Sequence, residues 1–196
     1  MISAASQDPA GARRDEDELS RLIEDAKRGR EWAWVAIYRI LAPPVLGYLR
    51  ALGSQEPEDL LGEVFLHVVR GLPAFDGSFA DFRSWVFIVG HHRVIDERRR
   101  RTRRPILGAA IDTLDVPSDE DLAEDVLESM STLRIRRIID GLPMPQREVL
   151  LLRILSGLKI NEIANLLGKS VGATKALQRR GLASIKRQIE REGVPL

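Results

Sequence analysis

The chain has 196 residues, with 30 basic and 29 acidic side chains, 5 % aromatic residues and no cysteine. The lack of cysteine excludes disulfides, thiolate zinc sites and cysteine nucleophiles, and it fits a reducing compartment such as the cytoplasm. No apolar run approaches the ~18 residues of a membrane span, and the N-terminus lacks the apolar centre of a signal peptide, so we expect no membrane insertion.

We predict an all-α fold, because every clear apolar periodicity in the chain is helical. Residues 1–15 are mostly small and polar and predict a disordered tail. Pro43 and Pro44 should break or kink the second helix. The helices of this first domain are expected over residues 17–28, 31–52, 57–70 and 81–101, with a loop at 72–80.

An acidic linker and a second small domain follow. Residues 105–124 contain proline and glycine, show weak periodicity and predict the linker. The second domain is expected at residues 125–191, followed by a tail at 192–196. Its helices are predicted over residues 125–140, 145–155, 161–167 and 171–190.

The formal net charge of +1 conceals four blocks of alternating sign. Residues 1–82 carry a net charge of −5, residues 83–104 carry +6, residues 105–133 carry −8 and residues 134–196 carry +8. Local charge decides attraction to a phosphate backbone, because the Debye length is only about 8–10 Å. A solvated surface would explain one basic block, but two basic blocks on separate helical frameworks favour a nucleic-acid partner.

The last two helices are separated by a tight glycine-containing turn, which is the spacing of a helix-turn-helix. On a helical wheel Lys175, Arg179 and Lys186 lie opposite an apolar arc that contains Thr174, Leu177, Gly181, Leu182, Ile185 and Ile189. An ordinary basic surface helix is the alternative. The predicted DNA-contacting residues are Ser170, Gly172, Ala173, Lys175, Ala176, Arg179 and Arg180.

The solvent side of the helix at 57–70 combines acidic residues with one large apolar residue. Asp59, Gly62, Glu63 and Leu66 share this side, opposite the stripe expected to face the core. A single exposed leucine is normal on any surface. An acidic face around a central leucine is also what a protein-docking surface offers.

Five of the ten aromatic residues lie between Phe75 and Phe87, ahead of an arginine-rich helix end. This mixture suits single-stranded nucleic acid, since each base stacks on an aromatic ring with about 1–3 kcal/mol while arginines hold phosphates. A core stripe is the preferred interpretation for Phe79 and Phe82, whereas Trp85 fits either role. The adjacent His91 and His92 point about 100° apart with no cluster of carboxylates, so no metal site is expected.

Together these motifs resemble the extracytoplasmic-function (ECF) sigma factors of the sigma-70 family, the two-domain promoter-recognition subunits of bacterial RNA polymerase. The resemblance covers residues 16–190. It rests on residues 58–66 (EDLLGEVFL), 72–77 (LPAFDG), 82–87 (FRSWVF), 95–96 (ID), 142–143 (LP), 146–153 (QREVLLLR) and 162–164 (EIA).

The resemblance implies that residues 16–104 form sigma domain 2 and residues 125–191 form sigma domain 4, with no enzymatic activity and no cofactor. It implies that the helix at 171–190 reads the minus-35 promoter element. The acidic linker would run through the polymerase toward the RNA path. The face implied to bind the coiled coil of the polymerase β′ subunit consists of Asp59, Gly62, Glu63 and Leu66.

The resemblance also places the minus-10 contacts in the aromatic loop and the helix that follows it. His92 stands where many relatives have a strand-contacting asparagine, so the minus-10 preference of relatives cannot be transferred. The residues implied to contact the minus-10 element are Phe75, Asp76, Gly77, Arg83, Trp85, His91, His92, Asp96, Arg99 and Arg100.

The expected partners are core RNA polymerase, through its β′ and β subunits, and promoter DNA. Family members are commonly held by an anti-sigma factor, so such a partner is expected too, although no residue identifies one. We expect a cytoplasmic protein that is monomeric when free. The residues alone also allow a stand-alone helix-turn-helix regulator with a helical sensor domain, which would bind a palindromic duplex as a dimer.

Overall fold

The computed structural model describes residues 9–103 and 136–191, and all regular structure in these two stretches is helical, which confirms the all-α prediction. The predicted linker at 105–124 and most of the helix predicted at 125–140 lie outside the described residues. The elements are α1 (Pro9–Lys27), α2 (Glu31–Ala51), α3 (Pro57–Gly71), η1 (Leu72–Ala74), α4 (Phe79–Arg103), α6 (Met144–Leu151), η2 (Leu152–Ser156), α7 (Ile160–Leu166) and α8 (Val171–Arg191).

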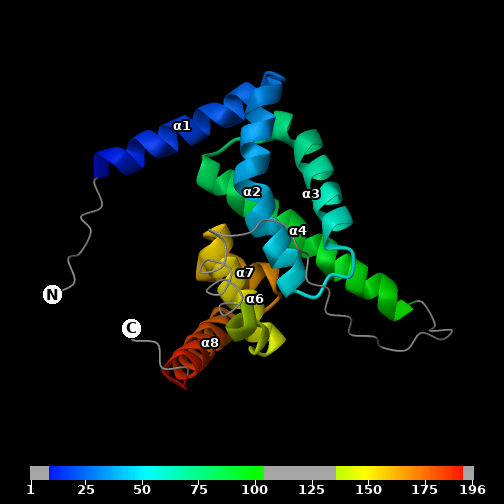
Figure 1. The fold of residues 1–196 in the computed structure, drawn as a ribbon, viewed down its shortest axis with the longest axis vertical. Helices are drawn as coiled ribbons and strands as arrows, with labels where there is room; N and C mark the ends of the chain where they lie inside the picture. Colours follow the sequence, from blue (N-terminus) through cyan, green and yellow to red (C-terminus); the bar gives the residue numbers. More distant parts are fainter. Residues whose placement is uncertain (1–8, 104–135, 192–196) are drawn as a thin grey trace, which may run out of the picture.

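The N-terminal unit consists of α1 to α4, in which α2 crosses α4 and α3 lies beside them (Figure 1). Its core is built on fully buried rings and branched aliphatic side chains, with Tyr48, Phe82 and Phe87 among the largest. The stripe of α3 that was predicted to face the core is buried at Leu60, Leu61, Val64, Phe65 and Val68, whereas Val69, also predicted in this stripe, is 45 % exposed because it lies at the edge of the packed face. The acidic side of α3 is therefore left on the surface.

Pro43 and Pro44 were predicted to break or kink the helix, and α2 continues through both of them without a break. The two prolines remove the backbone donors that would pair with the carbonyls of Arg39 and Ile40. Both of these residues are exposed, so water can replace the lost donors. By length and composition alone α2 could cross a membrane, but its buried residues, such as Leu41 and Val45, belong to the protein core.

Helix α1 begins at Pro9, eight residues before the predicted start at Asp17. Residues 9–15 were expected within the disordered tail and are helical, whereas residues 1–8 lie outside the described part of the chain. The physical reason is local: proline suits the first turn of a helix, and the following Ala10, Ala12 and Arg13 are good helix formers.

The C-terminal unit consists of α6, η2, α7 and α8. The chain turns at Gly157, whose φ of +78° lies in the left-handed region that favours glycine. Helix α8 packs against both α6 and α7. It approaches α6 closely where Gly181 faces Leu150, since a β-carbon on Gly181 would stand 2.6 Å from a methyl carbon of that leucine.

The two units contact each other, with α4 of the first packed against η2 of the second. One continuous apolar cluster includes Phe82 and Phe87 from α4 together with Leu152, Leu158 and Ile163 from the C-terminal unit. Figure 1 shows α6 and α7 gathered against one side of α4, with α8 farther out. The sequence predicted the two units but not this contact.

Candidate nucleic-acid and protein interfaces

An exposed acidic stripe runs along α3. Asp59, Gly62, Glu63 and Leu66 are all on the surface, with the Leu66 side chain 57 % exposed. The spacing of these residues puts them on one face of the helix. The Glu63 carboxylate lies 3.7 Å from the Arg93 guanidinium of α4, which ties the stripe to the neighbouring helix. The structure therefore brings together all four predicted docking residues.

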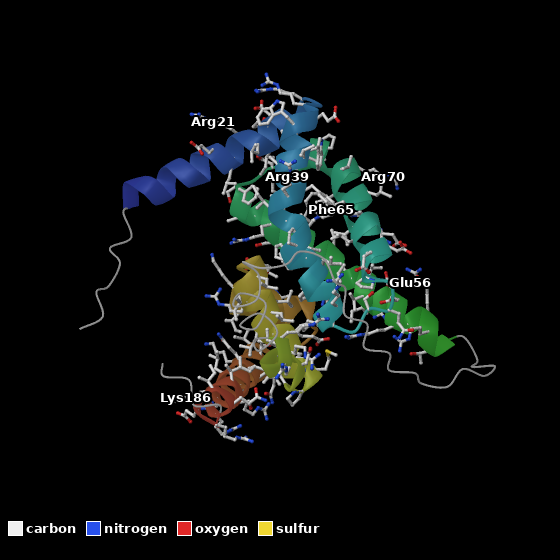
Figure 2. All side chains as sticks on the ribbon, in the orientation of Figure 1. Arg21, Arg39, Glu56, Phe65, Arg70 and Lys186 are labelled. Atoms are coloured by element: carbon white, nitrogen blue, oxygen red, sulfur yellow. The ribbon has the colours of Figure 1, made fainter. Side chains whose placement is uncertain are left out.

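Helix α2, which packs beside α3, exposes apolar residues that the sequence analysis missed. Trp32, Val35 and Tyr38 are exposed, and the Trp32 side chain is 54 % accessible. The Tyr38 ring contacts the ring of Phe65 on α3, with centroids 4.7 Å apart, so the two helices form one surface. Figure 2 shows Phe65 between α2 and α3. The only sequence signal was that α2 has more apolar residues than one buried face requires.

The loop after α3 and the start of α4 form a rigid aromatic corner. The Phe75 and Trp85 rings are stacked, with centroids 5.5 Å apart and planes 12° apart, and Phe82 meets both rings edge-on. Trp85 is half-buried, so part of its indole remains accessible. The core interpretation is confirmed for Phe79 and Phe82, which are buried. Trp85 combines a packed ring with surface access.

The first turn of α4 is capped by its own side chains. The backbone N–H and the hydroxyl of Ser78 both donate to the Asp81 carboxylate, at 3.0 and 2.7 Å, and the backbone N–H of Asp81 donates to the Ser78 hydroxyl. These hydrogen bonds hold the pKa of the Asp81 carboxyl below its usual value. Asp76 and Gly77 are exposed immediately before this cap, so this part of the loop is accessible to a partner.

The far end of α4 carries the basic surface. Arg99 and Arg100 are exposed, as are His92 and Asp96. Asp96 lies 3.7 Å from Arg99, a weak surface pair that leaves the guanidinium accessible. Six of the ten residues implied to contact the minus-10 element are thus fully on the surface. They are Asp76, Gly77, His92, Asp96, Arg99 and Arg100.

Of these ten residues, His91 is the one that is buried. The His91 side chain is only 3 % exposed, and its Nδ1 shares a 2.9 Å hydrogen bond with the Tyr48 hydroxyl. Burial, aided by the charges of His92 and Arg98, lowers the pKa of His91 to about 4, so the ring is neutral at pH 7. Burial also raises the pKa of Tyr48, with the Glu148 carboxylate as the second cause.

Arg83, also implied to contact DNA, lies against the C-terminal unit. A β-carbon on Gly157 would stand 2.8 Å from its Nη2, and its buried Nε has no hydrogen-bond partner among the described residues. In this arrangement Arg83 is half-buried and His91 is buried.

The end of α7, the turn and α8 form the predicted helix-turn-helix. Gly168 in the turn has a φ of +61°, and the Ser170 hydroxyl accepts a hydrogen bond from the backbone N–H of Ala173 at 3.1 Å, which caps α8. Ser170 is thus engaged in capping. Exposed residues of this predicted set are Ser170, Gly172, Ala173, Lys175, Arg179 and Arg180, whereas Ala176 is half-buried.

The orientation of α8 agrees with the helical wheel at all but one position. Thr174 and Gly181 are buried, and Lys186 is exposed at the outer end of the helix, where Figure 2 labels it. Leu182 was expected on the buried arc but is 49 % exposed. Lys175 and Arg179 form no ion pair with any described residue, so their charges are available to a partner.

Comparison with known families assigns both units. Residues 37–104 match the Sigma-70 region 2 family, and residues 132–185 match the Sigma-70 region 4 family. The first match spans the acidic stripe, the aromatic corner and the basic end of α4. The second spans the helix-turn-helix.

Three curated relatives carry the same description. The ECF RNA polymerase sigma factor BldN of Streptomyces coelicolor is 30 % identical over 177 residues, which are 88 % of this chain and 66 % of the relative. SigX of Bacillus subtilis is 30 % identical over 141 residues, 70 % of this chain and 72 % of the relative. SigD of Mycobacterium tuberculosis is 27 % identical over 183 residues, 90 % of this chain and 86 % of the relative.

Two solved structures share the fold. CnrH, solved in complex with the cytosolic domain of CnrY, superimposes with a TM-score of 0.54 at 21 % identity, covering 88 % of this chain and 98 % of CnrH. The sigma factor RpoE of Bartonella quintana, solved with the anti-sigma factor NepR, gives a TM-score of 0.58 at 18 % identity, covering 80 % of this chain and 96 % of RpoE. Both units, in order and on one chain, make this protein a member of the ECF sigma factors of the sigma-70 family, non-catalytic subunits that direct RNA polymerase to promoters and to transcription initiation.

Proposed function

We propose that the acidic stripe of α3 and the apolar residues of α2 together bind core RNA polymerase through the β′ coiled coil. The single observation that carries this assignment is the exposure of Leu66 on α3, between the exposed charged residues Glu63 and Arg70 and with Asp59 one turn farther back. A central apolar anchor with a charged rim is the usual anatomy of a protein interface. Trp32 adds the kind of aromatic residue that such interfaces favour.

The aromatic corner and the basic end of α4 bind the minus-10 element in this proposal. The capped loop at Asp76 and Gly77 offers exposed backbone and a carboxylate to a flipped base, whose unstacking costs a few kcal/mol. Trp85 supplies an aromatic edge, and Arg99 and Arg100 supply charge for the phosphates. His92 occupies an exposed position on the same helix and contacts the strand.

Helix α8 reads the minus-35 element in the major groove. Lys175 and Arg179 lie one turn apart on its exposed face and are the base-reading pair. Gly172 and Ala173 permit close approach at the capped N-terminus, and Arg180 contacts phosphate. In this assignment the positive block at residues 83–104 meets the minus-10 element, and the positive block at residues 134–196 meets the minus-35 element.

The functional domains are proposed as residues 16–104 and 125–191, with the acidic residues 105–124 between them. The chain acts as a soluble cytoplasmic protein and is monomeric until it meets the β′ and β subunits of the polymerase. An anti-sigma factor is a further proposed partner, by analogy with the Bartonella sigma factor that is solved with NepR.

Reconstitution with bacterial core polymerase tests the proposal. Transcripts made in vitro from total genomic DNA are sequenced with and without the chain, and start sites that depend on the chain identify its promoters. We expect a defined set of starts that disappears with the Asp59→Ala, Glu63→Ala double variant. Tight binding to a palindromic duplex without polymerase, together with no chain-dependent starts, would overturn it.

A further inference from the structure

A polar cavity of about 330 Å³ lies between α4 and the turn that follows α7. Helix α4 lines it with His91, Ile95 and Arg99, and the C-terminal unit lines it with Glu148 of α6 and residues 166–169. Ligand pockets in proteins usually measure about 300–1,000 Å³, so this cavity has room for one small molecule.

Two deeply buried polar side chains line the cavity, and each has one polar atom without a hydrogen-bond partner among the described residues. Glu148 is 9 % exposed, and its Oε1 accepts a hydrogen bond from Arg98 at 3.1 Å. His91 is 3 % exposed, and its Nδ1 shares the 2.9 Å hydrogen bond with Tyr48. Buried polar atoms are nearly always paired, so the Glu148 Oε2 and the His91 Nε2 call for a partner in the cavity.

Two exposed cations line the same cavity. Arg99 pairs weakly with Asp96 at 3.7 Å, and Lys169 forms no ion pair with any described residue. The charge of the Glu148 carboxylate is already balanced by Arg98. The groups around the cavity therefore carry a net positive charge, which attracts an anionic group toward Arg99 and Lys169.

The ligand that fits this pattern carries hydrogen-bond donors at one end and a negative group at the other. Inorganic phosphate alone would leave the Glu148 carboxylate unsatisfied, and an apolar molecule would leave both buried atoms unpaired. A polyamine would be repelled by Arg99 and Lys169. Ile95 and Leu166 are half-buried and give the cavity an apolar wall against which a flat ring can pack.

Guanosine phosphates have this pattern of groups. The guanine edge presents two neighbouring donors, the ring N1–H and the exocyclic amine, which can meet a single carboxylate, whereas adenine presents an acceptor at N1. Arginine and lysine are the side chains that bind phosphate most readily. We propose that the cavity binds one guanosine phosphate, with the guanine edge on the Glu148 carboxylate and the phosphate on Arg99 and Lys169.

His91 completes the site as a neutral hydrogen-bonding group. Its pKa is lowered to about 4, so the ring adds no charge at pH 7 and its Nε2 can contact the base or the ribose. The discrimination between bases thus comes from Glu148, and the attraction for the phosphate comes from Arg99 and Lys169.

Isothermal titration calorimetry of the full chain with guanosine monophosphate, adenosine monophosphate and inorganic phosphate tests the site. We expect guanosine monophosphate to bind with a dissociation constant of about 0.1 mM or less. It should bind about tenfold more tightly than adenosine monophosphate, because two hydrogen bonds between a base edge and a side chain discriminate by about that factor or more. Equal affinity for the two nucleotides, or phosphate binding as tightly as either, would overturn the site.

Glu148→Gln and Lys169→Gln separate the two halves of the site. Glu148→Gln keeps the shape but replaces one acceptor oxygen with a donor, so the preference for guanosine over adenosine monophosphate should disappear. A general loss of structure would weaken both nucleotides alike and leave that ratio unchanged. Lys169→Gln should weaken both about fivefold with the ratio intact, because the lysine meets only the phosphate. A ratio that Glu148→Gln leaves at its parent value would contradict the assigned reader.

Lys159→Gln is the matched control for the change at Lys169. The two lysines flank α7 and are both exposed, but Lys159 does not line the cavity. The control removes the same charge from the same unit and should leave both affinities as in the parent. A loss as large as that of Lys169→Gln would mean that the positive charge of the whole unit attracts the nucleotide, and it would overturn the site.

Nitrogen NMR of the histidine-labelled chain locates the ligand. The chain has three histidines, and His91→Gln assigns the resonances of His91. Guanosine monophosphate should move the His91 Nε2 resonance and leave that of His67, which lies beside Trp85, in place. A water molecule as the only partner of Glu148 and His91 predicts no shift with any nucleotide, and that result would overturn the site.

All of these measurements use the free chain, so they are independent of promoter recognition. A chain that binds no nucleotide but directs transcription from defined start sites would overturn the nucleotide site alone. A chain that binds guanosine monophosphate as expected but yields no chain-dependent starts would support the site and overturn the proposed function.

Discussion

The indole of Trp85 lies directly over Gly71, the last residue of α3. A β-carbon on Gly71 would stand 2.7 and 2.8 Å from two carbons of the six-membered ring, which is closer than real contacts allow. The glycine is therefore the reason that the aromatic corner can close onto the end of α3. Its backbone φ is ordinary, so the requirement is space and not backbone conformation.

Gly71→Ala should displace the Trp85 ring and separate it from Phe75. We expect a loss of about 1–3 kcal/mol in the free energy of unfolding, because overpacking forces a rigid ring to move. Promoter opening should also decrease, and the permanganate reactivity of unpaired thymines measures it. Gly47→Ala is the control: nothing lies within 4 Å of its added carbon, and alanine should stabilise α2 by up to about 1 kcal/mol. Equal effects of both changes would contradict the contact.

We expect the acidic stripe of α3 to contribute to the affinity for core polymerase. Asp59→Ala combined with Glu63→Ala should weaken the binding of core polymerase at least tenfold while the melting temperature stays within a few degrees, because both side chains are exposed. Fluorescence anisotropy of the labelled chain measures the affinity. Glu56→Ala, an exposed acid just before α3 (Figure 2), should leave it unchanged. A loss of affinity with Glu56→Ala as large as that of the double variant would show that charge alone matters.

The exposed cations of α8 predict promoter selectivity. Lys175→Ala and Arg179→Ala should each cost about 1–3 kcal/mol at a cognate minus-35 element and relax the preference there. Lys186→Ala, farther along the same helix, should weaken initiation uniformly across promoters and reduce the salt dependence. Competition between promoters in a single transcription reaction measures both effects. Unchanged selectivity with Lys175→Ala and Arg179→Ala would place the reading face elsewhere on α8.

His91 predicts a pH dependence of stability. Its pKa is lowered to about 4 in the folded chain from an ordinary value of 6.5, so the unfolded chain binds more protons between these limits. The free energy of unfolding should therefore fall as the pH drops from 6.5 toward 4, by up to about 3 kcal/mol from this group. Urea unfolding at several pH values measures the slope. His91→Gln, which can still hydrogen-bond to Tyr48, should flatten it, and an unchanged slope would show that other groups dominate.

The sequence was sufficient for features that depend on a single helix. Leu66 could be placed among acids, and Lys175 opposite Thr174, because a 3.6-residue period fixes which residues share a face. The exposure of Leu182 departs from this pattern because α8 contacts its neighbours over a narrower arc than the wheel suggests.

Features that depend on two elements could not be predicted in the same way. Leu152 and Ile163 are apolar whether they pack only within the C-terminal unit or also against α4, so their sequence does not distinguish the two arrangements. The burial of His91 depends on Tyr48, 43 positions earlier in the chain. The continuity of α2 through Pro43 and Pro44 depends on solvent reaching the carbonyls of Arg39 and Ile40, which no local pattern reveals.

Pro43 and Pro44 remove two successive hydrogen bonds from the backbone ladder of α2, although the helix continues on both sides of them. The stretch before the prolines carries the exposed Trp32 and Tyr38. The stretch after them carries the buried Tyr48, and at its end the carbonyls of Ala51 and Leu52 accept hydrogen bonds from Arg147 and Arg98. With these two bonds missing, local opening of the backbone should cost less beside the proline pair than elsewhere in α2. A partner that binds Trp32 and Tyr38 would therefore contact the stretch before this weaker point, apart from the stretch that carries the buried Tyr48.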